Sequence, residues 1–238
     1  MILPADKLAK LEKIYSDTRD VFETHASHYL TKPTVLGGDI GFCILYTPPI
    51  LNPDLLVIGK NPSFFNPSNE FSEEDNLMMS GTIPTVNSYL EHKHLFAREL
   101  KNMFCYESEK PNILDNTVGM NIWFFQGKKI PDGRTGKLGE LKKSCEKATK
   151  DLIRLLKPKT ILAVGQEAMD VCDSDNMADY EYWKASQERK VRVFGKTKFE
   201  NICPVFMCSH LTGARIPTEQ KEIYRQKCRE QILLIAEN

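Results

Sequence analysis

Short apolar runs alternate with longer segments of helical period along this chain, and this alternation constrains the fold more than any other feature. The apolar runs cover residues 55–58, 117–125, 160–164 and 203–208. Each is compact and suits a strand that is buried on both faces. Apolar residues at helical spacing predict helices over residues 86–104, 138–155, 165–171 and 218–235, the last capped by Thr218. Strands separated by helices imply a parallel sheet, because each right-handed crossover must cover the sheet.

We therefore predict an α/β protein with three layers, α/β/α, around a central four-stranded, mainly parallel sheet. Two weaker segments, residues 40–46 and 190–194, predict a short strand and an edge strand. A helical segment at residues 5–32 precedes them, and Pro33 ends it. No internal repeat, low-complexity tract or linker divides the chain, so residues 1–238 are expected to form a single domain.

Charge balance, cysteine spacing and the length of the apolar stretches limit the kinds of protein and the cellular compartments that suit this chain. The 32 basic and 32 acidic residues cancel, which argues against a non-specific coat protein for nucleic acid but leaves room for a local basic face. The seven cysteines include no C-x-x-C pair, so we expect reduced thiols rather than a zinc ribbon or a redox motif. No stretch approaches the roughly 20 apolar residues of a membrane span. We expect a cytoplasmic monomer that does not enter membranes.

Polar residues follow the predicted strands at the positions where parallel sheets bind ligands, beyond the carboxyl ends. Residues 59–65 (GKNPSFF) follow the first core strand, and residues 209–215 (SHLTGAR) follow the fourth. The second core strand carries one amide, Asn121, within an apolar run. These three segments are expected to meet at one end of the sheet.

Three side chains in these segments suit the binding and release of a pyrimidine. The amide of Asn61 can hold a water molecule, and Asn121 offers the donor and acceptor that match the O4/N3 edge of uracil. His210 can donate to an oxygen on which charge develops. Each also has a structural interpretation: a tight turn, a buried amide and a structural histidine. Their joint placement at strand ends favours a site.

Two of these segments resemble motifs of a known family. Gly59-Lys60-Asn61-Pro62-Ser63 resembles the first motif of the uracil-DNA glycosylase superfamily, in the form found in its mismatch-specific and single-strand-selective branches. The segment from His210 to Arg215 is similar to the second motif, and residues 160–168 (TILAVGQEA) resemble the segment between the two motifs. The resemblance covers about residues 50–235.

The resemblance implies a uracil-DNA glycosylase-like fold and a function in base-excision repair. The enzyme would hydrolyse the N-glycosidic bond of uracil or a related damaged base in DNA, with no metal or cofactor. Asn61 would orient the attacking water, and His210 would stabilise the leaving base. The residues expected to bind the base are Gly59, Lys60, Pro62, Ser63, Phe65 and Asn121.

DNA is the expected partner, and contacts with it are expected beside the same end of the sheet. Cations in the glycine-containing loop after the second core strand suit phosphate binding, although a solvated loop has the same composition. The residues expected to contact DNA are Lys128, Lys129, Arg134 and Lys137 in that loop, and Thr212, Gly213 and Arg215 in the second motif.

Two other functions remain open at the level of sequence. Leu211 and Thr212 stand where the family has Pro and Ser, and Thr85 stands where its branches carry a stacking Phe. These departures keep open a non-catalytic module that binds nucleic acid or a nucleobase on the same fold. An unrelated α/β hydrolase acting on a small metabolite is the third possibility.

Overall fold

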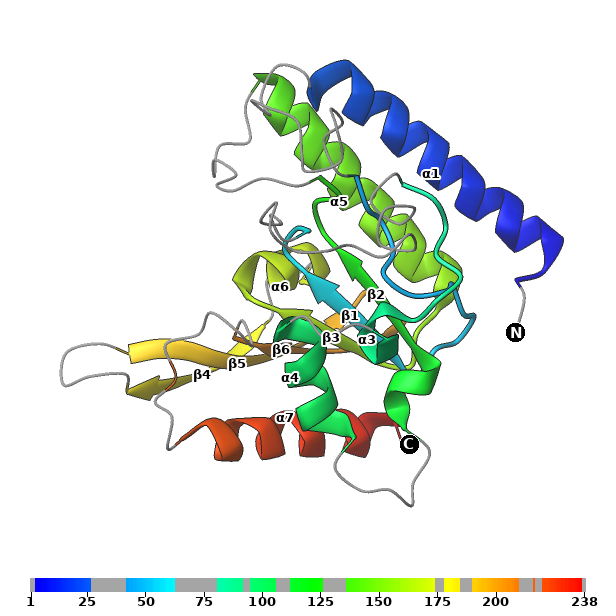
Figure 1. Ribbon diagram of the computed structural model, residues 1–238. Coiled ribbons are helices and arrows are strands. Elements are labelled where there is room, and N and C mark those ends of the chain that lie inside the picture. Colours follow the sequence, from blue (N-terminus) through cyan, green and yellow to red (C-terminus); the bar gives the residue numbers. More distant parts are fainter. Residues whose placement is uncertain are drawn as a thin grey trace.

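The computed structural model describes residues 3–26, 42–62, 81–91, 95–105, 112–125, 136–173, 178–184, 190–209, 216 and 220–236. Within these residues, six strands form one sheet in the order β2-β1-β3-β6-β5-β4 (Figure 1). The strands are β1 (Leu55–Gly59), β2 (Thr117–Asn121), β3 (Ile161–Val164), β4 (Asp179–Lys184), β5 (Lys190–Phe199) and β6 (Cys203–Cys208).

The part of the sheet from β2 to β6 is parallel throughout. β1 pairs with β2 on one side and with β3 on the other, and β3 pairs with β6. These four strands lie within the four apolar runs of the sequence, and the α/β class is confirmed. The strand expected over residues 117–125 is shorter than predicted, because β2 ends at Asn121. Their carboxyl ends share one edge of the sheet, since parallel strands run in the same direction.

The sheet has six strands rather than the predicted four, because β5 and β4 extend it in antiparallel pairing. Residues 190–194 were expected to form an edge strand, but β5 runs to Phe199 and lies between β6 and β4. Only residues 200–202 connect β5 to β6, and a parallel crossover needs a dozen residues or more, so the pair must be antiparallel.

The expected strand at residues 40–46 is not formed by its described part. Phe42 and Leu45 instead make isolated antiparallel bridges to Phe125 and Met120. The outer edge of β2 and the described residues after it are therefore paired only at these two bridges, and not by a continuous neighbouring strand. Past the end of β2, the amides of Ile122 and Trp123 donate to the carbonyls of Gly59 and Lys60, at 2.9 and 3.0 Å, so the pairing of the two chain segments continues beyond the strands.

The helices lie on both faces of the sheet. They are α1 (Ala5–Ala26), α3 (Ser88–Glu91), α4 (Leu95–Phe104), α5 (Gly136–Leu156), α6 (Gln166–Cys172) and α7 (Lys221–Ala236), with a 3₁₀ turn η1 at Ile113–Asn116. The helix expected over residues 86–104 is two helices, α3 and α4. Residues 27–32 of the expected N-terminal segment, and Thr218, lie outside the described residues.

Successive side chains of a strand point to opposite faces of the sheet, so the strands contribute to two hydrophobic cores, one on each face. In β1, Leu56 and Ile58 pack with α1, α5 and α6, whereas Leu55 and Val57 pack with α3, α4 and α7. Figure 1 shows α1 beside α5 on one face and α4 beside α7 on the other, which gives three layers. In the part of the chain that the structure describes, no helix combines the length and apolar character needed to cross a membrane.

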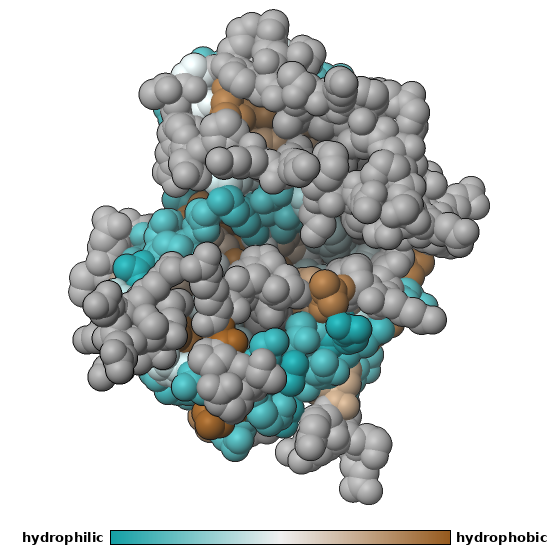
Figure 2. Space-filling view, turned by 60° about the vertical axis from the view of Figure 1, so that its left-hand side comes forward, coloured by the Kyte–Doolittle hydropathy of each residue, from teal (hydrophilic) through white to brown (hydrophobic). Residues whose placement is uncertain are grey.

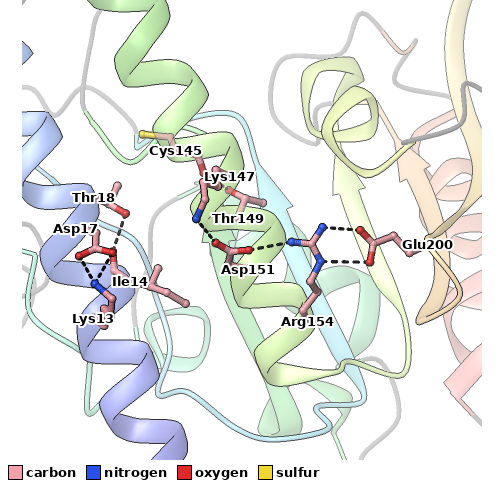
Figure 3. A network of polar contacts seen from close by, with 10 residues as sticks. All are labelled: Lys13, Ile14, Asp17, Thr18, Cys145, Lys147, Thr149, Asp151, Arg154 and Glu200. Carbon is pink, nitrogen blue, oxygen red and sulfur yellow. Dashed lines mark hydrogen bonds and ion pairs between the residues drawn. The ribbon is translucent and has the colours of Figure 1, made fainter.

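A network of charged groups ties α5 to the turn between β5 and β6 (Figure 3). Arg154 donates to both carboxylate oxygens of Glu200, at 2.6 and 3.3 Å, and to Asp151 at 2.9 Å. The guanidinium lowers the pKa of the Glu200 carboxyl. Because Glu200 precedes β6, this network lies at the amino end of that strand, at the opposite edge of the sheet from Gly59 and Asn121.

Candidate functional site

The carboxyl ends of β1, β2, β3 and β6 lie at one edge of the sheet, and the described parts of the predicted site segments, Gly59 to Pro62, Asn121 and Ser209, lie there. Gly59 is the direct partner of Asn121, and Val164 is the partner of Cys208. Neighbouring strands lie about 4.8 Å apart, so β1 and β6, with β3 between them, end roughly 10 Å apart. The loops that begin after Gly59 and Cys208 therefore start within reach of one small ligand.

The structure describes Gly59, Lys60, Asn61, Pro62 and Asn121 among the predicted site residues. The others lie outside the described residues: Ser63, Phe65, Lys128, Lys129, Arg134, His210, Thr212, Gly213 and Arg215. Lys137 belongs to the first turn of α5, but its side chain is likewise outside them. Ser209 is the last described residue before His210, and it lies directly after β6.

Asn121 is a buried amide held over a glycine at the end of β2. Its side chain is 5% exposed, and Nδ2 donates to the hydroxyl of Tyr46 at 2.6 Å. A Cβ on Gly59 would lie 2.5 Å from Oδ1 of Asn121, so only glycine at position 59 permits this placement. No described residue donates to Oδ1. Oδ1 is not one of the fully buried side-chain atoms that lack a hydrogen-bond partner in the described residues, so it keeps some exposure and is open to a ligand N–H.

Aromatic rings position the hydroxyl that holds Asn121. Tyr46 stacks on Tyr89 with ring centroids 6.4 Å apart and planes 17° from parallel, and Tyr89 contacts Phe96 at 5.9 Å. Burial raises the pKa of Tyr46 well above its usual value, so its phenol stays neutral. Tyr89 in turn lies on Gly119 of β2, where a Cβ would be 2.3 Å from its hydroxyl oxygen.

Asn61 is half-buried and its amide is oriented by the adjacent backbone. Nδ2 donates to the carbonyl oxygen of Pro62 at 2.8 Å. This bond leaves Oδ1 as an acceptor, which is the atom that would hold a water molecule by one of its hydrogens. The arrangement of Asn61 is compatible with the water-orienting role expected from the sequence.

Lys60 joins the loop after β1 to the helix after β3. Its Nζ forms an ion pair with Glu167 of α6 and lies 5.1 Å from the centroid of the Trp123 ring. Lys142 of α5 is fully buried and lies 4.3 Å from the same centroid. Two lysine side chains therefore approach one indole, and the charge of Lys60 is balanced by Glu167.

The sequence analysis missed the contacts of Tyr46, Glu167 and Trp123 at this site. Tyr46 lies in a segment expected to be a strand, and Trp123 in an apolar run that gave no sign of a cation contact. Glu167 had one available signal: it is the second residue of the helix that begins at the carboxyl end of β3.

The other groups that could carry chemistry in the described residues are thiols and metal-ligating side chains. Burial raises the pKa of Cys145 and of Cys203 to about 12 in each case, so both thiols are protonated and weakly nucleophilic at neutral pH. Among the side chains that the structure describes, no three of the types His, Cys, Asp and Glu are grouped so that they could hold a metal ion. The described site consists mainly of amides, a phenol and cations.

Gly59→Ala is expected to lower the free energy of unfolding by about 1–2 kcal/mol, because the new methyl must displace the Asn121 amide from Tyr46. Urea denaturation measures this loss. In an Asn121→Ala background the obstructing oxygen is gone, so adding Gly59→Ala should cost much less. An equal loss in both backgrounds would show that the two residues are not in contact.

Comparisons with known proteins do not assign a family to the chain. No protein-family model matches it, and no curated protein matches its sequence.

Proposed function

We propose that this chain is a DNA glycosylase that hydrolyses the N-glycosidic bond of uracil or a related damaged base, at the carboxyl ends of β1, β2 and β6. The observation that carries the proposal is the amide of Asn121. It is buried and held by Tyr46, and its Oδ1 accepts no hydrogen bond from the described residues. It lies beside the Gly59 end of β1, from which the Asn61 loop begins.

Base selection follows from the free acceptor of Asn121. The base must leave the duplex stack to reach it, at a cost of a few kcal/mol. Uracil carries a hydrogen on N3 that Oδ1 can accept, whereas cytosine presents a lone pair there. Two facing acceptors would leave the buried amide unpaired, which is a strong basis for rejecting the wrong base.

Hydrolysis would use a water molecule held by Asn61. The water oxygen forms a bond to C1′ of the sugar while the bond from C1′ to the base nitrogen breaks, and the electron pair leaves with the base. His210 donates a hydrogen bond to the base oxygen on which this charge develops. The water loses its proton to solvent, and the released base anion takes one up.

A labelled oligonucleotide with one uracil tests this function. Incubation with the full chain, followed by alkali, should break the strand at the uracil and leave the matched thymine and cytosine strands intact. Binding without strand breakage would favour a non-catalytic module. Cleavage of free nucleosides alone would favour a small-metabolite hydrolase, and either result would overturn the proposal.

A further inference from the structure

An arginine and two tyrosines lie together on the antiparallel part of the sheet, where Tyr182 is exposed and Tyr180 and Arg192 are partly buried. We call Tyr180, Tyr182 and Arg192 the arginine–tyrosine platform. The guanidinium carbon of Arg192 lies 4.0 Å from the ring centroid of Tyr180 and 5.7 Å from that of Tyr182. Tyr182 is 50% exposed, so part of its side chain is accessible to a ligand.

The register of β4 and β5 explains why these three residues meet. Tyr180 is opposite Gly195, where a Cβ would lie 2.8 Å from the tyrosine ring, so the glycine lets the ring lie against the strand. The register shifts between Glu181 and Tyr182, and this places Arg192 opposite Tyr182. Directly opposed residues share a face, so the guanidinium reaches both rings.

The charge of Arg192 is not neutralised by direct contact with a carboxylate of the described residues. Its Nη1 donates to Oε1 of Gln166, and its Nη2 donates to the hydroxyl of Tyr182 at 3.3 Å. Gln166 also donates to the hydroxyl of Tyr180 at 3.0 Å and to a carboxylate oxygen of Asp170. By contrast, Arg154 and Arg225 bind carboxylates directly.

The platform adjoins the proposed site through two connections. The hydroxyl of Ser209, the residue before His210, donates to the backbone oxygen of Arg192 at 2.8 Å. Gln166 precedes Glu167, which pairs with Lys60 of the first loop. In Figure 1, β4 and β5 extend to the left of the parallel strands. Figure 2 brings that side forward and shows bands of hydrophilic residues broken by small hydrophobic areas.

We propose that the arginine–tyrosine platform binds an unpaired nucleotide of the DNA strand that carries the target base. Tyr182 offers a ring face for a base, and Arg192 offers a planar cation for the adjoining phosphate. Stacking on an aromatic side chain tolerates any base, which suits a contact outside the specific pocket. A base paired within a duplex stacks on its neighbours and has no free face for Tyr182. This inference rests on the proposed function and names a second contact of the same substrate.

The test is the affinity for a single-stranded oligothymidine of roughly 15 nucleotides, a length that matches common single-strand binding sites. This probe contains no uracil, so excision does not enter the measurement. Fluorescence anisotropy should give a dissociation constant about tenfold higher for Tyr182→Ala, the loss expected for one stacked base. Tyr182→Phe keeps the ring and should stay within about twofold of the unaltered chain.

Ile223→Ala supplies the matched control, because Ile223 is an exposed apolar residue, 59% accessible, on α7. It should leave the affinity unchanged, and thermal melting should show all three variants folded. The inference is overturned if Tyr182→Ala binds oligothymidine as well as the unaltered chain does, or if Ile223→Ala binds it as weakly as Tyr182→Ala does. It is also overturned if Tyr182→Ala weakens binding of a blunt duplex as much as binding of the single strand.

Uracil release by the unaltered chain separates the two proposals. If oligothymidine binding depends on Tyr182 but no uracil is released, the platform stands and the glycosylase function fails. If uracil is released and Tyr182→Ala binds oligothymidine normally, the platform fails alone.

Discussion

Asn61→Ala and His210→Ala are each expected to lower the single-turnover rate of uracil release by roughly a hundredfold to a thousandfold. Asn61 has a half-buried amide whose Nδ2 donates to the Pro62 carbonyl, and this bond orients Oδ1, which can accept a hydrogen from water. His210 follows Ser209 at the end of β6 and would stabilise charge on the departing base. Rapid quenching with alkali measures the abasic sites formed.

The control for this prediction is Asn201→Ala. Asn201 is an exposed asparagine in the turn before β6, at the opposite end of that strand. Its loss should leave the rate unchanged. Combining Asn61→Ala with His210→Ala should slow release less than the product of the single effects, because groups that act in one transition state are not additive. Normal rates in both single variants would remove the two residues from the chemistry.

Gly119→Ala is expected to lower the free energy of unfolding by about 3 kcal/mol. Gly119 lies in the middle of β2, and a Cβ there would be 2.3 Å from the hydroxyl oxygen of Tyr89 and 2.5 Å from two of its ring carbons. The ring is packed between Tyr46 and Phe96, so it cannot move without disturbing both. The midpoint of urea denaturation measures the loss.

Two backgrounds show whether the Tyr89 ring causes this loss. In Tyr89→Phe the two obstructing ring carbons remain, so Gly119→Ala should still be strongly destabilising. In Tyr89→Ala the ring is absent, and Gly119→Ala should cost little more. A denaturation midpoint unchanged by Gly119→Ala alone would contradict the packing of β2 against α3.

The parallel core was predictable because burial on both faces leaves apolar runs with little ambiguity. β4 was missed for the opposite reason. Its sequence from Asp179 to Lys184 mixes charged and aromatic residues without a regular alternation, because Tyr182 and Trp183 are adjacent, and it contains no apolar run. The length of β5 was underestimated because its second half carries Lys196 and Lys198.

Asn121 was correctly placed in a core strand, but that strand was expected to run to residue 125 and ends at Asn121 instead, and the surroundings of the amide could not be predicted. Any amide that ends a core strand of a parallel sheet lies near the ligand-binding edge. Its contacts with Gly59 and Tyr46 depend on β1 being the neighbour of β2, and strand order is set by tertiary packing between segments far apart in the chain. The pairing of Lys60 with Glu167 depends in the same way on β3 lying next to β1.

A crystal structure of the full chain with uracil bound examines the proposed site most directly. The base should lie at the carboxyl ends of β1, β2 and β6, with its N3 about 3 Å from Oδ1 of Asn121 and the His210 imidazole near an oxygen of the ring. Uracil bound elsewhere on the molecule, or Asn61 and His210 facing separate surfaces, would show that these strand ends do not form a glycosylase site.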